Sequence, residues 1–85
     1  MRGRQAACLE VYVSRQCDNC SEARQLAELA AALHPQLVVH VIEIDHRPPP
    51  EGIVAVPTYV LDGRVISLGN PYPEELFARL DGAAE

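Results

Sequence analysis

Apolar residues alternate with other residues early in the chain, between Leu9 and Ser14. One face of this segment would carry the aliphatic side chains of Leu9, Val11 and Val13, and the other face those of Cys8, Glu10 and Tyr12. Side chains two positions apart point to the same side of an extended chain. The alternation therefore predicts a strand with its aliphatic face turned towards the core.

The repeat lengthens in the next segment, from Ser21 to Leu33. Apolar residues recur there every three or four positions, at Ala23, Leu26, Ala27, Leu29, Ala30 and Leu33. This spacing gathers them on one stripe of a helix, with charged and polar residues on the other side. The segment predicts an amphipathic helix that ends near His34-Pro35, because the residue before a proline disfavours helical geometry.

A β-branched, mostly apolar run from Leu37 to Ile44 follows the predicted helix. Such a run is typical of a parallel strand that is buried on both faces. Three successive prolines then lie within Arg47–Gly52. Because proline lacks a backbone donor and disfavours helix in the residue before it, this segment is predicted to be a stiff surface connection.

The last third of the chain predicts a hairpin and then a helix. Asp62-Gly63 stands between Thr58–Leu61 and Arg64–Leu68, and these two residue types supply the positive φ angles of a tight turn. Asn70 is predicted to cap the helix, and Gly82 to end it. The apolar stripe of this helix would be Leu76, Phe77 and Leu80.

Composition narrows the classes of function. The chain has 85 residues, of which 48% are hydrophobic and 22% charged, so we expect one globular domain over residues 1–85. Its net charge is −5 and its basic residues form no cluster, which argues against nucleic acid as a partner. No apolar run approaches the roughly 18 residues of a membrane span, and the first eight residues do not resemble a signal peptide. We expect a cytoplasmic monomer that does not bind membranes.

Two of the three cysteines, Cys17 and Cys20, are three positions apart at the start of the first predicted helix. A disulfide that closes so short a ring stabilises a fold by only about 2 kcal/mol. In a reducing compartment this spacing therefore indicates metal binding or redox chemistry. Residues three apart in a helical turn bring their Cα atoms to about 5 Å, within the range that a disulfide accepts.

The position of Cys17 favours a reactive thiolate. Unpaired N–H groups at a helix start stabilise a thiolate and lower its pKa. Arg15 would favour the thiolate, whereas Asp18 would oppose it. Cys20, one turn deeper, is expected to stay protonated and to resolve the mixed disulfide by attacking Cys17.

Two stretches resemble a known superfamily. Val11–Cys20, with the sequence VYVSRQCDNC, resembles the strand and active-site turn of glutaredoxins and small thioredoxins, and Gly52–Thr58 resembles a segment that both families place after their second main helix. The resemblance implies a thioredoxin-like α/β fold, a four-stranded mixed sheet in the order βαβ…ββα. The second helix would be shortened or lost, because Asp45–Pro57 is short and rich in proline. It also implies a small dithiol–disulfide oxidoreductase.

The resemblance also implies a substrate-binding surface. In these families the proline corresponding to Pro57 is cis and lies against the cysteine pair. Val56 would then offer its backbone N–H and C=O to an extended substrate segment, as an added strand does. Arg15, Pro57 and Thr58 are the other residues expected to contact substrate.

The expected partners are protein disulfides and a thiol or flavoprotein reductant. No cofactor is expected beyond the redox-active disulfide of Cys17 and Cys20. Glutaredoxins that bind glutathione usually carry paired glycines after the last strand, whereas Leu68–Pro71 contains one glycine. A protein dithiol or a reductase is therefore the expected electron source in place of glutathione.

Two other classes of function remain open from the sequence. Cys17 and Cys20 could bind a metal, although structural zinc usually needs four ligands, and Cys8, His40 and His46 do not form a second half-site. The fold could also serve as a non-catalytic interaction domain that binds a partner over the face left by the shortened helix. Cys8 itself is interpreted as a packed or edge thiol.

Overall fold

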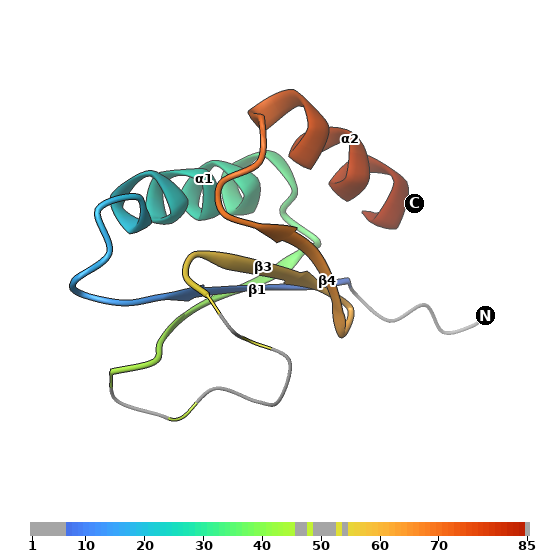
Figure 1. Ribbon diagram of the computed structural model, residues 1–85. Helices are drawn as coiled ribbons and strands as arrows, with labels where there is room; N and C mark the ends of the chain where they lie inside the picture. Colours follow the sequence, from blue (N-terminus) through green and yellow to red (C-terminus); the bar gives the residue numbers. More distant parts are fainter. Residues whose placement is uncertain (1–6, 46–47, 49–52, 54, 85) are drawn as a thin grey trace.

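The computed structural model describes residues 7–45, 48, 53 and 55–84, which form four strands and two helices (Figure 1). In chain order these elements are β1 (Cys8–Val13), α1 (Cys20–Leu33), β2 (Val38–Glu43), β3 (Thr58–Leu61), β4 (Arg64–Leu68) and α2 (Pro73–Ala84). Their order is the one that the sequence predicts. The expectation of a shortened or lost helix between Asp45 and Pro57 falls mostly outside the described residues.

The strands form one mixed sheet in the order β2-β1-β3-β4. β1 pairs with β2 in parallel and with β3 antiparallel, and β3 pairs antiparallel with β4. The predicted hairpin is confirmed, since Asp62 and Gly63 have φ angles of 52° and 84°. This positive pair gives the turn a twist that matches the flanking strands.

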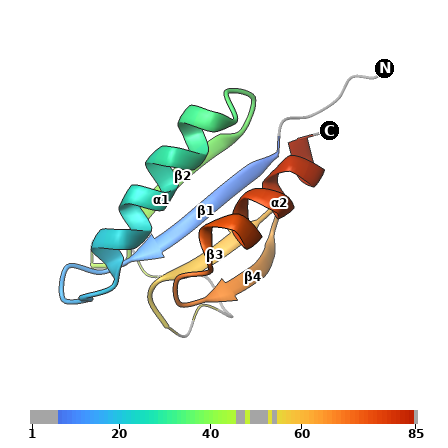
Figure 2. The ribbon, with the colours of Figure 1, turned by 90° about the horizontal axis from the view of Figure 1, so that it is seen from above.

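Both helices lie on the same face of the sheet, with α1 over β1 and β2 and α2 towards β3 and β4 (Figure 2). The core between the layers contains Leu9, Val11 and Val13 of β1, Ala23, Leu26, Ala27 and Ala30 of α1, and Leu76 and Leu80 of α2. The aliphatic face predicted for the first strand is therefore confirmed. Leu29 and Leu33, which also belong to the predicted stripe of α1, are instead exposed.

The prediction that the second strand is buried on both faces is wrong. β2 is an edge strand that pairs only with β1 in the described sheet. Val38 and Val41 are therefore 41% and 42% exposed. The face of the sheet turned away from the helices carries the exposed side chains of Val38, Val65 and Leu68, whereas Val41 lies on the helix side beside Val11.

Two expectations about the last helix are also wrong. α2 begins at Pro73, and its first turn closes on the carbonyl of Tyr72, which accepts hydrogen bonds from Glu75 and Leu76. Asn70 lies too far upstream to cap it. Gly82 does not end the helix, which continues to Ala84, because a single glycine costs only about 1 kcal/mol in a helix.

Candidate active site

The turn between β1 and α1, residues 14–20, is called the cysteine turn below. Cys17 and Cys20 form a disulfide in it, with their Cα atoms 5.4 Å apart. The Cys17 N–H donates to the Ser14 carbonyl at 3.4 Å, and the Cys20 N–H donates to the Cys17 carbonyl at 3.2 Å. These bonds shape the turn so that α1 begins at Cys20.

The two sulfur-bearing residues differ in burial. Cys20 is 0% exposed and belongs to the core cluster, whereas Cys17 is half-buried and packs against that cluster from outside. Arg15 and Asp18, which flank Cys17, are both exposed. An incoming disulfide can therefore reach Cys17 more readily than Cys20.

Asp45 holds one side of the cysteine turn. Its carboxylate accepts hydrogen bonds from the Arg15 N–H at 2.8 Å and from the Ser14 hydroxyl at 3.4 Å. The parallel register pairs Val13 with Glu43, so residues 15 and 45 leave the sheet side by side. Asp45 was not predicted as a site residue, although its position just past a strand parallel to β1 was a signal that could have found it.

Asn70 holds the other side of the turn. Its amide nitrogen, Nδ2, donates to the Asn19 carbonyl at 2.8 Å, and its Oδ1 accepts from the Tyr59 hydroxyl at 2.7 Å. Burial, and to a smaller degree the charge of Glu22, raise the pKa of the Tyr59 phenol. The hydroxyl therefore stays protonated and able to donate. From the sequence, Asn70 was predicted to cap the last helix, and Tyr59 was not predicted as a site residue.

The start of β3 lies at the same end of the sheet as the cysteine turn, because Tyr12 pairs with Thr58. The Val56–Pro57 peptide bond is cis. Pro57 and Thr58 are buried, and the Thr58 hydroxyl donates to the Ala55 carbonyl. The Pro57 carbonyl accepts from the Gly69 N–H at 2.7 Å. Val56 is half-buried and packs, like Cys17, against the core cluster.

The other candidate residues do not assemble a metal site in the part of the chain that the structure describes. It contains no group of three or more His, Cys, Asp and Glu side chains placed to hold a metal ion. Cys8 lies at the opposite end of β1 from the cysteine turn, and His46 falls outside the described residues. Among the described helices, none is long and apolar enough to cross a membrane.

A family model described as a thioredoxin domain matches residues 8–80, which include the cysteine turn and the cis proline. The chain belongs to the thioredoxin family. It is 33% identical over 72 residues to a thioredoxin of Methanocaldococcus jannaschii, an alignment that covers 80% of this chain and 85% of that protein. A thiol–disulfide oxidoreductase-like function follows in general terms from this membership.

Two further likenesses are to part of a longer protein and to a solved structure. The chain is 32% identical over 75 residues to a subunit of the alkyl hydroperoxide reductase of Xanthomonas campestris pv. phaseoli, covering 85% of this chain and 14% of that protein. A structure solved to study the thiol resolving mechanism in yeast mitochondrial 1-Cys peroxiredoxin via glutathione/thioredoxin systems superposes with a TM-score of 0.74. That superposition covers 93% of this chain and 80% of the other, at 16% identity. It confirms the thioredoxin-like fold.

Proposed function

We propose that this thioredoxin-family protein is a small dithiol–disulfide oxidoreductase in which Cys17 attacks and Cys20 resolves. The observation that carries the proposal is the Cys17–Cys20 disulfide at the start of α1, with Cys17 half-buried and Cys20 fully buried. The unequal burial favours different roles for the two sulfurs. The attacking thiolate must meet a substrate, whereas the resolving thiol needs only to reach its neighbour.

The exchange proceeds in two steps. The Cys17 thiolate attacks one sulfur of a substrate disulfide, so a Cys17–substrate bond forms while the substrate bond breaks and its second sulfur leaves as a thiolate. Cys20 then loses its proton and attacks Cys17 Sγ, which forms the Cys17–Cys20 bond and releases the first substrate sulfur. Two electrons pass to the substrate, and a dithiol donor returns them when it reduces Cys17–Cys20.

Val56 is the backbone position that we assign to substrate binding. The described residues offer its N–H and C=O no hydrogen-bond partner. Its neighbour Pro57 is bonded through the carbonyl to Gly69, which fixes the chain on one side of Val56. An extended substrate segment can pair with Val56 as an added strand, and Arg15 is exposed on the cysteine turn.

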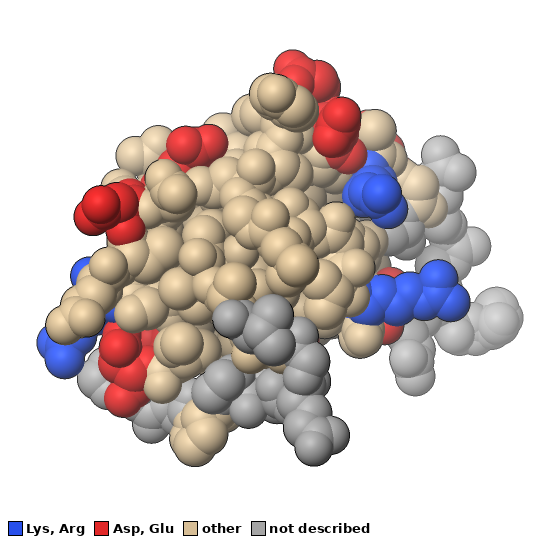
Figure 3. All heavy atoms as spheres, in the orientation of Figure 1, with Lys and Arg blue, Asp and Glu red and all other residues tan. Residues whose placement is uncertain are grey.

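We assign protein disulfides as substrates and a protein dithiol or flavoprotein reductase as the electron donor. The similarity to a subunit of alkyl hydroperoxide reductase supports a reductase partner. The net charge is −5, and on the face in Figure 3 basic side chains lie only at its margins, without a continuous patch. A net negative charge without a basic patch favours binding to a protein over binding to the phosphate backbone of a nucleic acid. We place the activity in the cytoplasm and in a monomer.

Insulin reduction with dithiothreitol as donor tests the proposal. The wild-type protein should accelerate the reduction, and Cys17→Ser should not. Mass spectrometry of the protein after mild oxidation should show a loss of about two mass units and no retained metal. Equal insulin rates for the two proteins would contradict the exchange activity, and stoichiometric metal in the reduced protein would assign the cysteine pair to metal binding.

A further inference from the structure

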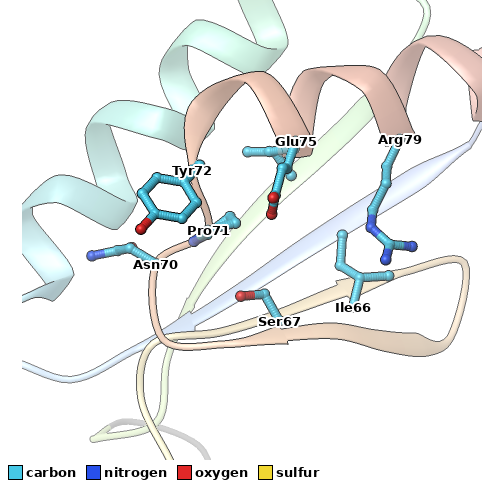
Figure 4. A pocket seen from close by; sticks show the side chains of 8 residues that line it. Ile66, Ser67, Asn70, Pro71, Tyr72, Glu75 and Arg79 are labelled. Atoms are coloured by element: carbon cyan, nitrogen blue, oxygen red, sulfur yellow. The ribbon is translucent and has the colours of Figure 1, made fainter.

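Asn70 connects three parts of the chain that are far apart in sequence. It lies between β4 and α2, its Oδ1 accepts from Tyr59 of β3, and its Nδ2 donates to Asn19 of the cysteine turn. Figure 4 shows Asn70 at one end of a groove between β4 and α2, with its amide nitrogen turned away from the groove. The amide nitrogen of Asn70 thus makes its hydrogen bond to the cysteine turn and does not point into the groove.

The orientation of the Asn70 amide follows from its partners. A backbone carbonyl such as that of Asn19 can only accept a hydrogen bond, so the amide nitrogen must face it. Oδ1 then faces Tyr59, whose hydroxyl can donate. Tyr59 is 0% exposed and lies in a central strand of the sheet. The Asn19 carbonyl is therefore linked, through one amide group, to a fixed point in the core.

We propose that Asn70 is a positioning residue for the Cys17–Cys20 couple, which holds the cysteine turn in the conformation that closes the disulfide. This inference rests on the proposed exchange function and names a residue that controls it. Asn19 lies inside the ring that the disulfide closes. Its carbonyl carbon forms the peptide bond with the nitrogen of Cys20. Fixing that carbonyl fixes Cys20 relative to Cys17.

The effect differs between the oxidised and reduced states. In the oxidised protein the disulfide itself restricts residues 17–20. In the reduced protein that restriction is lost, and the Asn19 carbonyl is then held by the Ala23 N–H of α1 at 3.3 Å and by the shorter bond from Asn70 at 2.8 Å, which ties it to β3 as well. Less freedom in the dithiol raises the effective concentration of one sulfur at the other. Asn70 should therefore favour closure of the disulfide and speed attack by Cys20.

A set of three variants separates this role from a contribution to stability alone. Asn70→Ala removes both hydrogen bonds and leaves the buried Tyr59 hydroxyl without its partner. Tyr59→Phe removes only that hydroxyl and keeps the bond from Asn70 to Asn19. The double variant removes the link to Asn19 without leaving a buried hydroxyl unpaired, so it should fold about as stably as Tyr59→Phe. All variants are made with Cys8→Ser, so that only the cysteine pair reacts.

Two measurements follow. Equilibration with dithiothreitol buffers gives the reduction potential of the Cys17–Cys20 couple. Reaction of the reduced protein with 5,5′-dithiobis(2-nitrobenzoate) releases one thiolate when Cys17 attacks and a second when Cys20 resolves. We expect Asn70→Ala and the double variant to destabilise the disulfide about tenfold, which raises the potential by about 30 mV. The second release should slow by about the same factor. Tyr59→Phe frees the Asn70 amide from the core but keeps its bond to Asn19, so it should change either quantity by a smaller factor of about two to three.

The outcomes distinguish a positioning role of Asn70 from a contribution to stability alone. A wild-type potential in the double variant would overturn the proposal, because the effect of Asn70→Ala would then come from the unpaired Tyr59 hydroxyl. Equal shifts in Tyr59→Phe and the double variant would overturn it as well. The potential is measurable even if the protein does not reduce insulin, so failure of the proposed function would be seen separately from failure of this inference.

Discussion

Cysteines lie near both ends of β1, and the groups that surround them differ between the two ends. At its amino end the backbone of Cys8 is hydrogen-bonded to Asp62, whose carboxylate accepts from the Cys8 N–H at 2.9 Å and whose N–H donates to the Cys8 carbonyl at 2.8 Å. Burial, and then the charges of Glu10 and Asp62, raise the pKa of the Cys8 thiol. At the carboxyl end Cys17 and Cys20 stand where α1 begins.

We expect the reactivity of each cysteine to follow from the groups around it. Backbone N–H groups at a helix start favour a thiolate, whereas nearby carboxylates oppose it. Each end is held by an aspartate bonded to a backbone N–H, Asp62 at Cys8 and Asp45 at Arg15. The backbone support is therefore similar, and the helix start and the second cysteine are the features to which we assign the proposed reactivity of Cys17.

The largest expected effect comes from exchanging each cysteine for serine. Cys17→Ser should lower the rate of insulin reduction by about a thousandfold or more, because the attacking thiolate is lost. Cys20→Ser should leave Cys17 able to attack and unable to be resolved, so a covalent adduct with the substrate should accumulate. Cys8→Ser should leave the rate within about twofold of wild type.

Non-reducing electrophoresis and mass spectrometry measure the adduct. An adduct on Cys17→Ser but not on Cys20→Ser would reverse the two roles. A large loss of rate in Cys8→Ser would show that the two ends of β1 do not differ in the way that their surroundings indicate.

Elements whose signals are local could be predicted from the sequence. The period of β1, the stripe of α1 and the Asp62-Gly63 turn depend on residues within a few positions of each other. The structure has the strand and the turn, and it buries four of the six residues of the predicted stripe. The cysteine pair was found for the same reason, since its spacing and the following helix lie in one short segment.

The rest depends on contacts between distant segments. An apolar run does not tell whether a strand is central or at an edge, so β2 was placed wrongly. Asn70 contacts a residue 51 positions away, and Asp45 one 30 positions away. A polar side chain near a helix start looks like a cap from the sequence, whereas the packing of the sheet brings Asn70 to the cysteine turn instead.

A smaller effect is expected at Asp45. Asp45→Ala leaves the Arg15 N–H without its acceptor, and because the bond is exposed the free energy of unfolding should fall by only about 1 kcal/mol. The looser turn should slow insulin reduction a few-fold. Asp62→Asn, which corresponds to Asp45→Asn at the other end of β1, tolerates the positive φ of the turn and should leave the rate unchanged.

Urea unfolding and the insulin assay on the same preparations measure both quantities. Asp45→Asn, which keeps a carbonyl oxygen as acceptor, should recover most of the activity. Equal rates for wild type and Asp45→Ala would show that this carboxylate supports the fold without affecting the chemistry of the turn.

The smallest effect concerns the acidity of Cys8. Since Glu10 and Asp62 both raise the pKa of its thiol, Glu10→Gln and Asp62→Asn should lower that pKa and increase the thiolate fraction at pH 8. Alkylation of Cys8 by iodoacetamide should then be two- to threefold faster in the double variant, measured with both Cys17 and Cys20 replaced by serine. An unchanged rate would mean that burial alone determines the acidity of this thiol.

The same shift links Cys8 to stability at high pH. A thiol whose pKa is raised in the folded protein binds its proton more tightly there than in the unfolded chain. Its contribution to stability is fully present below the ordinary thiol pKa of about 8.5, and it is lost as the pH rises through the higher pKa of the folded state. Wild-type protein should therefore lose more stability than Cys8→Ala between pH 8 and pH 10 in urea unfolding. If the free energy of unfolding changed with pH in the same way for both proteins, the pKa of the Cys8 thiol would be the same in the folded and unfolded states.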